Sequence, residues 1–243
     1  MSSTTARILG IASVLAVWFL LADVVFLGTG VIIDPIKTVI RIVELGQTDS
    51  FWLALTHTIA STAVSFVFAY VLAFFLALLG HWWKPLKHLV KPYITIMRSM
   101  PTVAVILVLF MVIDWSFITF VVAFLVTFPL LFTQLSAAFA EVDLSEIDAA
   151  KSIGLNGPQR VFFVYLGVMQ KLMISAVRSG FGLNLKVVIA SEVLGIPTVS
   201  LGLSIVRAKQ VFEYSDAFVY LVVTVLLAFL VDKILEKMEC VLY

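Results

Sequence analysis

Charged side chains are scarce in this sequence of 243 residues, and their scarcity excludes an ordinary soluble protein. Lys and Arg number 16, Asp and Glu number 15, and together they make up 13% of the chain, whereas 62% of it is hydrophobic. Soluble domains carry about 25% charged and about 45–50% apolar residues. With a mean hydropathy of +1.14, the composition predicts a membrane protein. The net charge of +1 also excludes a nucleic-acid binder, which needs clustered Lys and Arg.

Residues that build disulfides, metal sites and phosphate loops are also few. Cys240 is the only cysteine, and the three histidines, His57, His81 and His88, form no HExxH pair. These features exclude a disulfide framework, a Cys-rich zinc site and a membrane zinc protease. The sequence also has no G-x-x-x-x-G-K-[ST] phosphate loop. These residues give no sign of a catalytic residue or of a bound metal or cofactor.

Six apolar stretches are long enough to cross a membrane, which takes about 20 residues of α-helix. They cover residues 8–27, 52–79, 93–113, 117–138, 172–196 and 217–235. The first stretch lacks the basic start and the cleavage site of a signal peptide, so we expect it to be retained. No internal repeat or linker divides the chain. The sequence therefore predicts an all-α, polytopic membrane protein in which residues 1–243 form one domain.

Lysine and arginine in the short loops predict which side of the membrane each loop faces. The segment from His81 to Lys91 carries three lysines and no acid. The interval 141–171 adds Lys151, Arg160 and Lys171, which gives this side a modest excess of positive charge. The excess places both termini and the interval 141–171 in the cytoplasm.

The polar interval 141–171 has the pattern of a short helix, a tight turn and a second helix. Asp143 followed by Glu146 marks a helix start, and Gly154 suits the C-terminal cap, where a left-handed residue is common. The turn follows at 156–158, where Pro158 suits the start of the second helix. An apolar stripe recurs at helical spacing along the first helix: Leu144, Ile147, Ala150 and Ile153. On periodicity alone, an amphipathic connecting loop explains this interval equally well.

Part of this interval resembles a known family. Asp148-Ala149-Ala150-x-x-x-Gly154 is similar to the EAA motif of ABC importer permeases, the cytoplasmic helix that docks into a groove of the ATPase subunit. Asp148 replaces the commoner glutamate with the same charge, and Gly167 stands where the family usually has a proline. Four further landmarks resemble the nitrate/sulfonate/taurine-type permeases: Arg98-Ser-Met-Pro101, Phe128-Pro129, Arg178 with Ser191-Glu192, and Leu201-Gly202-Leu203. The resemblance covers residues 52–239.

The resemblance implies a type I importer permease of a bacterial plasma (inner) membrane, with a coupling helix between spans four and five. Asp148, Ala149, Ala150 and Gly154 would couple it to a cytoplasmic ATPase dimer, which holds ATP and Mg²⁺. An external solute-binding protein would deliver a nitrate-, sulfonate- or taurine-like solute, or a small heterocyclic or vitamin-like compound. A second permease, which would be either another copy of this chain, the alternative we favour, or a related chain, would complete the pathway within the lipid bilayer.

Polar side chains inside the fifth span need an explanation, because a charge at the centre of a helix costs about 2.5–3.5 kcal/mol to insert. Asn184, Lys186 and Glu192 are candidates for the wall of the solute pathway. Alternatively, the two charges are paired with other spans or across a dimer interface. Gly180 and Gly182 in the same span allow close approach of a neighbouring helix.

Three further residues near span ends receive structural interpretations. Arg98 and Arg178 can extend their long side chains to the membrane interface. Pro101 lacks an amide hydrogen and predicts a kink in the third span. We therefore assign Arg98 and Pro101 a structural or gating role.

Two other classes of function compete with an importer permease. An ion-coupled secondary transporter or channel needs coupling carboxylates in mid-membrane, and Glu192 alone gives thin support for one. A membrane scaffold would carry out no transport. Retention of an ATPase that responds to a loaded binding protein distinguishes the importer from both.

Overall fold

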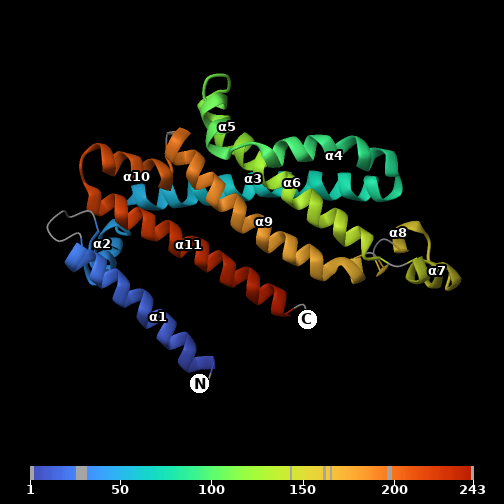
Figure 1. Ribbon diagram of the computed structural model, residues 1–243, viewed down its shortest axis with the longest axis horizontal. Helices are drawn as coiled ribbons and strands as arrows, with labels where there is room; N and C mark the ends of the chain where they lie inside the picture. Colours follow the sequence, from blue (N-terminus) through green and yellow to red (C-terminus); the bar gives the residue numbers. More distant parts are fainter. Residues whose placement is uncertain are drawn as a thin grey trace. The chain divides into compact units, whose positions relative to one another are not determined.

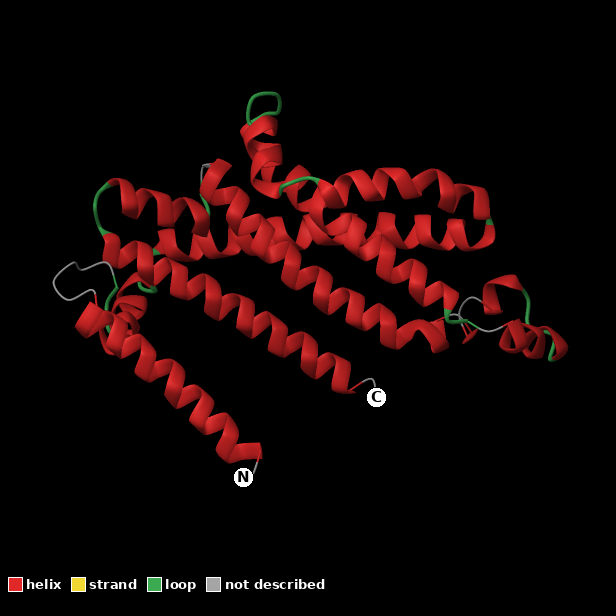
Figure 2. Cartoon of the chain, in the orientation of Figure 1, coloured by secondary structure: helices red, strands yellow, loops and turns green. Residues whose placement is uncertain are grey.

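The structure, a computed structural model, describes residues 3–25, 32–142, 144–160, 163–164, 166–195 and 199–241. Over these residues the chain forms helices joined by turns and loops and contains no strand (Figure 2). The all-α prediction is therefore confirmed for the described part of the chain.

The helices follow one another along the chain as labelled in Figure 1. Their bounds are α1 Ser3–Leu20, the π-helix η1 Leu21–Val25, α2 Pro35–Leu45, α3 Asp49–Trp82, α4 Lys84–Ser99, α5 Thr102–Leu109, α6 Trp115–Ala140, α7 Leu144–Ser152, α8 Gly157–Arg160, α9 Leu166–Gly195, α10 Leu201–Gln210 and α11 Tyr214–Val241. Long apolar helices thus alternate with short ones, as expected when membrane spans are joined by surface segments.

Four helices are long and apolar enough to cross a membrane: α3, α6, α9 and α11. They coincide with the predicted spans at 52–79, 117–138, 172–196 and 217–235, apart from residue 196, which lies outside the described residues. These four spans are confirmed. At the predicted first span the apolar helical segment runs only over Ala12–Val24, which is short for a crossing.

The predicted third span, 93–113, is not one straight helix. Its residues are divided between α4 and α5, which are bent by 93° relative to each other. The break falls at Met100 and Pro101, both in extended backbone conformation, with ψ of 127° and 117°. Proline disfavours the α conformation in the residue before it, so the kink predicted from Pro101 is present. The bent pair is either a broken span or a re-entrant segment.

The chain packs as two compact units, residues 1–58 with 196–227, and residues 59–195 with 228–243. In the first unit, Phe51 and Ala54 of α3 pack with Leu201 of α10 and with Val219 and Val223 of α11. This division describes packing, and the single-domain organisation of the sequence remains a prediction.

The second unit is built around the pairing of α6 with α9, which lie side by side (Figure 1). A Cβ added at Gly180 of α9 would lie 2.5 Å from Cδ2 of Leu131 and 3.2 Å from Cε2 of Phe66. A Cβ there would require the Leu131 side chain to shift, so Gly180 allows the close approach that the sequence predicts. At Gly182 an added Cβ would meet nothing within 4 Å, so this glycine does not serve close packing inside the chain.

Candidate functional site

The predicted coupling segment contains a short helix with a well-formed C-terminal cap. Gly154 has a φ of 82°, in the left-handed region that glycine adopts without strain. The amide of Leu155 donates to the carbonyl of Ala150 (3.1 Å), and the amide of Gly154 donates to that of Lys151 (2.9 Å). This pair of bonds is the Schellman motif. The predicted cap at Gly154 is therefore confirmed.

Side chains at the end of α7 and just beyond it face away from the chain. Asp148 and Ala149 are exposed. Nζ of Lys151, in the same helix, lies 2.7 Å from Oδ1 of Asp148 and forms an ion pair with it. Ile153 is 76% exposed, whereas Ala150 is buried, so the predicted apolar stripe is not buried as one face. An added Cβ at Gly154 would meet nothing within 4 Å. This end of α7 is thus open to another surface.

A second helix, α8, follows the turn. The amide of Gln159 donates to Oδ1 of Asn156 (3.1 Å), and the amide of Asn156 donates to Oε1 of Gln159 (3.0 Å). These reciprocal bonds form a capping box with Asn156 as the N-cap. The predicted turn at 156–158 is therefore misplaced: the chain turns at 153–156, α8 already begins at Gly157, and Pro158 is its second residue rather than its first. The start predicted at Asp143, and residues 161, 162 and 165 of the second helix, lie outside the described residues.

Within the second unit, α7 and α8 lie beyond the ends of α6 and α9 (Figure 1). The chain leaves α6 at Ala140 and returns in α9 at Leu166. In sequence, α7 and α8 thus lie between two of the long apolar helices.

Asn184 of α9 lies at the centre of a buried polar cluster in the second unit. Its amide nitrogen donates to the carbonyl of Thr62 (2.8 Å) and to the hydroxyl of Ser65 (2.9 Å), both on α3. Its amide oxygen accepts from the hydroxyl of Thr127 on α6 (3.0 Å). Because all four side chains are fully buried, Asn184 ties three helices together. Its geometry supports packing, and a pathway role for it remains a prediction.

The other two candidate pathway residues occupy different environments on α9. Glu192 is fully buried, whereas Lys186 is exposed. They lie six residues apart, or about 120° apart around an α-helix, which separates them as the sequence predicts. The structure thus does not bring Asn184, Lys186 and Glu192 together on one surface.

Arg98 lies in the last turn of α4 and is exposed, next to the break at Pro101. Lys87, His88 and Lys91 of the same helix line a cavity of about 430 Å³ together with Arg98 and with residues of α6. Arg98 therefore belongs to a group of basic side chains along α4.

Two ion pairs between distant segments were not predicted. In the second unit, Arg178 of α9 donates through Nε and Nη2 to the two carboxylate oxygens of Asp232 on α11, at 2.9 and 3.1 Å. Arg178 is therefore paired rather than only extended to the interface. Asp232 falls inside the predicted span 217–235, and an acid inside a span is itself a signal that a partner exists.

The second unpredicted pair lies in the first unit. Arg41 of α2 donates through Nε and Nη2 to both oxygens of Asp216 at the start of α11, each at 2.8 Å. The hydrogen bonds to Asp216 and then to Glu44 raise the pKa of Arg41. This bidentate pair fixes α2 against the first turn of α11.

Over the described residues, no three His, Cys, Asp or Glu side chains gather as metal ligands would. The site therefore consists of an exposed capped helix, joined to long apolar helices whose polar groups are largely internal. This arrangement is that of a multi-pass helical membrane protein with an exposed, capped short helix.

Comparison with known proteins identifies the family. The family described as binding-protein-dependent transport system inner membrane component matches residues 69–237, which is most of the chain. The chain therefore belongs to this family and is a type I ABC importer permease. No curated protein matches the sequence.

Solved structures show the same fold. The inward-facing MetNI methionine ABC transporter superposes with a TM-score of 0.67 at 17% identity, covering 79% of this chain and 97% of that chain. A second crystal form of that transporter gives a TM-score of 0.63 at 16% identity, with coverage of 79% and 97%. An amino acid ABC transporter crystallised with histidines gives 0.65 at 17% identity, covering 84% and 96%.

Proposed function

We propose that this permease forms, with a second copy of itself, the pathway for a small solute delivered by an external binding protein. ATP and Mg²⁺ are held by a separate cytoplasmic ATPase dimer, and this chain binds neither. The protein crosses the bacterial inner membrane six times, with α1 and the bent α4–α5 pair completing the set of spans. Both termini and α7 are cytoplasmic. The family match carries this proposal.

In this proposal α7 is the coupling helix that docks into the ATPase. The exposed Asp148 and Ala149, the exposed Ile153 and the open space at Gly154 support docking. Ala150, which is buried, supports α7 from within the chain. Closure of the ATPases on ATP would move α7 as a rigid body and tilt α6 and α9. ATP would thereby bias one conformational equilibrium shared by the docked proteins.

The solute belongs, in this proposal, to the nitrate-, sulfonate- or taurine-like class or to small heterocyclic or vitamin-like compounds. The four landmarks that resemble that permease group support it, from Arg98-Ser-Met-Pro101 to Leu201-Gly202-Leu203. Among the candidate pathway residues, Lys186 is exposed on α9 and fits a pathway wall or a contact with the second copy. Glu192 is fully buried and would reach the pathway only if helices separate.

Reconstitution in liposomes tests the function. The permease, the ATPase and the solute-loaded binding protein are combined, and solute uptake is followed with and without internal ATP. We expect uptake only with ATP and the binding protein together. Uptake that follows an ion gradient without ATP would instead identify a secondary transporter, and no uptake by a fully assembled complex would indicate a scaffold. Lys186→Met that leaves assembly and uptake unchanged would exclude Lys186 from the pathway.

A further inference from the structure

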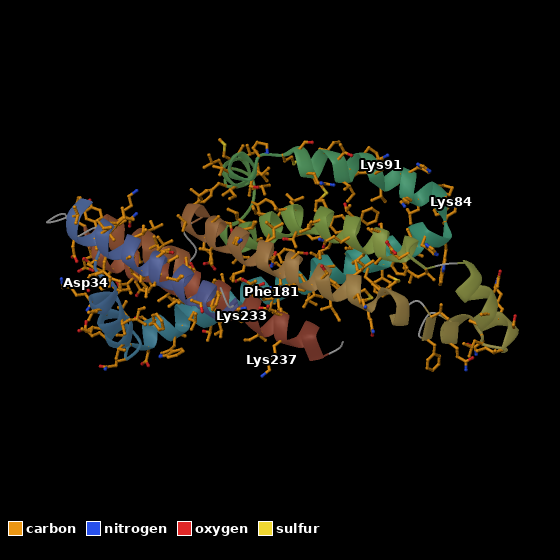
Figure 3. The ribbon with its side chains drawn as sticks, turned by 60° about the horizontal axis from the view of Figure 1, so that its bottom comes forward. Asp34, Lys84, Lys91, Phe181, Lys233 and Lys237 are labelled. Atoms are coloured by element: carbon orange, nitrogen blue, oxygen red, sulfur yellow. The ribbon has the colours of Figure 1, made fainter. Side chains whose placement is uncertain are left out.

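One face of α4 carries a row of basic side chains that the coupling function does not use. The basic residues Lys84, Lys87, His88, Lys91 and Arg98, with the hydroxyl-bearing Thr95, all fall within an arc of about 100° at 3.6 residues per turn. Figure 3 shows Lys84 and Lys91 along this helix. All six side chains are exposed. The row therefore concentrates positive charge on one side of a membrane-associated helix.

The basic row borders a groove between α4 and α6. The groove has a volume of about 430 Å³, and α6 contributes Phe132, Thr133, Ser136, Ala137 and Ala140. Ile94 and Phe132 are buried and form an apolar floor, whereas the small side chains of Ala137 and Ala140 leave room on the α6 side. No carboxylate is among the described residues that line it. Hydroxyl groups of Thr95, Thr133 and Ser136 complete the lining.

The groove lies close to the depth of lipid headgroups. Trp82 and Trp83, at the junction of α3 and α4, are 60% and 62% exposed, and exposed tryptophans mark the membrane–water interface. Lys84 and Lys87 follow within about one helical turn. A different face of α4 exposes Leu89, Tyr93 and Ile96, as expected of a surface in contact with acyl chains. The N-terminus of α4 has no side-chain cap, and its dipole adds positive potential there.

We propose that the groove between α4 and α6 binds the headgroup of an anionic phospholipid from the leaflet in which Trp82 and Trp83 lie. Lys87 and Lys91 attract the phosphate, and an acyl chain packs on Ile94 and Phe132. Positive charge without a compensating acid selects an anion, and the apolar floor selects a ligand that also carries a hydrocarbon chain. Basic pockets between membrane helices bind anionic lipid headgroups in this way.

Lipid binding by the purified full-length chain tests the proposal. The chain is held in a neutral detergent, phosphatidylglycerol is titrated in, and bound lipid is counted by native mass spectrometry. We expect Lys87→Gln/Lys91→Gln to bind phosphatidylglycerol about 30-fold more weakly, at roughly fivefold for each lysine. Lys87→Arg/Lys91→Arg keeps the charge and should retain binding, which shows that the fold tolerates substitution at these positions. Lys237→Gln removes an exposed lysine outside the groove and should have no effect.

Three results would overturn the proposal. The first is equal affinity of the Gln double variant and the unsubstituted chain for phosphatidylglycerol. The second is displacement of the lipid by inorganic phosphate at equal phosphate concentration, which would identify a site for a free anion. The third is loss of solute uptake in the double variant with unchanged lipid affinity, which would make the groove a wall of the solute pathway.

Discussion

The helices α9 and α7 differ in where their polar side chains lie, inside the chain or at its surface. In α9 the central polar side chain, Asn184, has its hydrogen bonds supplied by α3 and α6 of the same chain. At the end of α7, Asp148 and Ala149 are exposed, and among the described residues Asp148 pairs with Lys151 of the same helix. The polar groups of α9 thus join helices of one chain, whereas the exposed end of α7 is left accessible to a partner of the kind we propose.

The largest loss of stability is expected where α9 meets α3 and α6. Asn184→Leu removes three buried hydrogen bonds between helices, and at about 0.6 kcal/mol each the free energy of unfolding should fall by about 2 kcal/mol. Unfolding by SDS in mixed micelles measures this. Ser191→Ala is the matched control, because Ser191 bonds only to the carbonyl of Val188 in its own helix. Equal losses for both variants would show that Asn184 does not join the helices.

Gly180 and Gly182 of α9 allow a packed and an unpacked position to be compared within one helix. Gly180→Ala places a Cβ against Leu131 and Phe66, so overpacking should lower the free energy of unfolding by about 1 kcal/mol. Gly182→Ala meets nothing within 4 Å and should be neutral or stabilising, because alanine favours the helix. The same unfolding assay compares the two variants. A larger loss at Gly182 would contradict the packing of α9 on α6.

A smaller effect is expected from the ion pair between α9 and α11. Arg178 and Asp232 have side chains that are 33% and 48% exposed, so solvent weakens their attraction. A double-mutant cycle with Arg178→Gln and Asp232→Asn should give a coupling energy of about 0.5 kcal/mol. A coupling energy of zero would mean that Asp232 does not hold Arg178, which also lies 3.9 Å from the carboxylate of Glu236.

The smallest effect is expected at the start of α2. The amide of Lys37 donates to the Asp34 carboxylate, and this bond, followed by that from the Lys37 side chain, lowers the pKa of Asp34. A lowered folded pKa adds stability above the unfolded value, and this is lost as the pH falls through the folded value. The Asp34→Asn variant also caps the helix, but its amide does not titrate. Thermal unfolding should therefore show the unsubstituted chain to be more stable than this variant at pH 7, and the advantage should disappear below the ordinary aspartate pKa of 3.8. An advantage that does not change with pH would exclude this cap.

Sequence patterns predict the parts of the fold that depend on local chemistry. The apolar runs locate α3, α6, α9 and α11 because membrane solvation acts on each helix separately. Gly154 locates the cap of α7 because few other residues adopt a left-handed backbone. Pro101 predicts a kink for a similar reason, but the 93° angle depends on what α5 packs against.

Contacts between distant segments could not be predicted in the same way. The partners of Asn184 lie 57 to 122 residues away, and nothing local selects them. Arg178 alone suggests extension to the interface. Asp232, an acid inside a predicted span, is the local signal that a partner exists. The basic residues of α4 are evident in the sequence. The groove beside them depends on where α6 lies, which no local pattern indicates.

The affinity of the cytoplasmic ATPase for the permease in detergent tests most directly whether α7 is the coupling helix. Ala149→Arg places a long cation on the exposed end of α7. A substitution at Gly154 would strain the left-handed backbone there, whereas this one does not. Lys151→Arg on the same helix keeps its charge and serves as the control. We expect Ala149→Arg to weaken ATPase binding by about tenfold or more, whereas Lys151→Arg should bind as the unsubstituted chain does. Unchanged ATPase binding by Ala149→Arg would contradict α7 as the coupling helix.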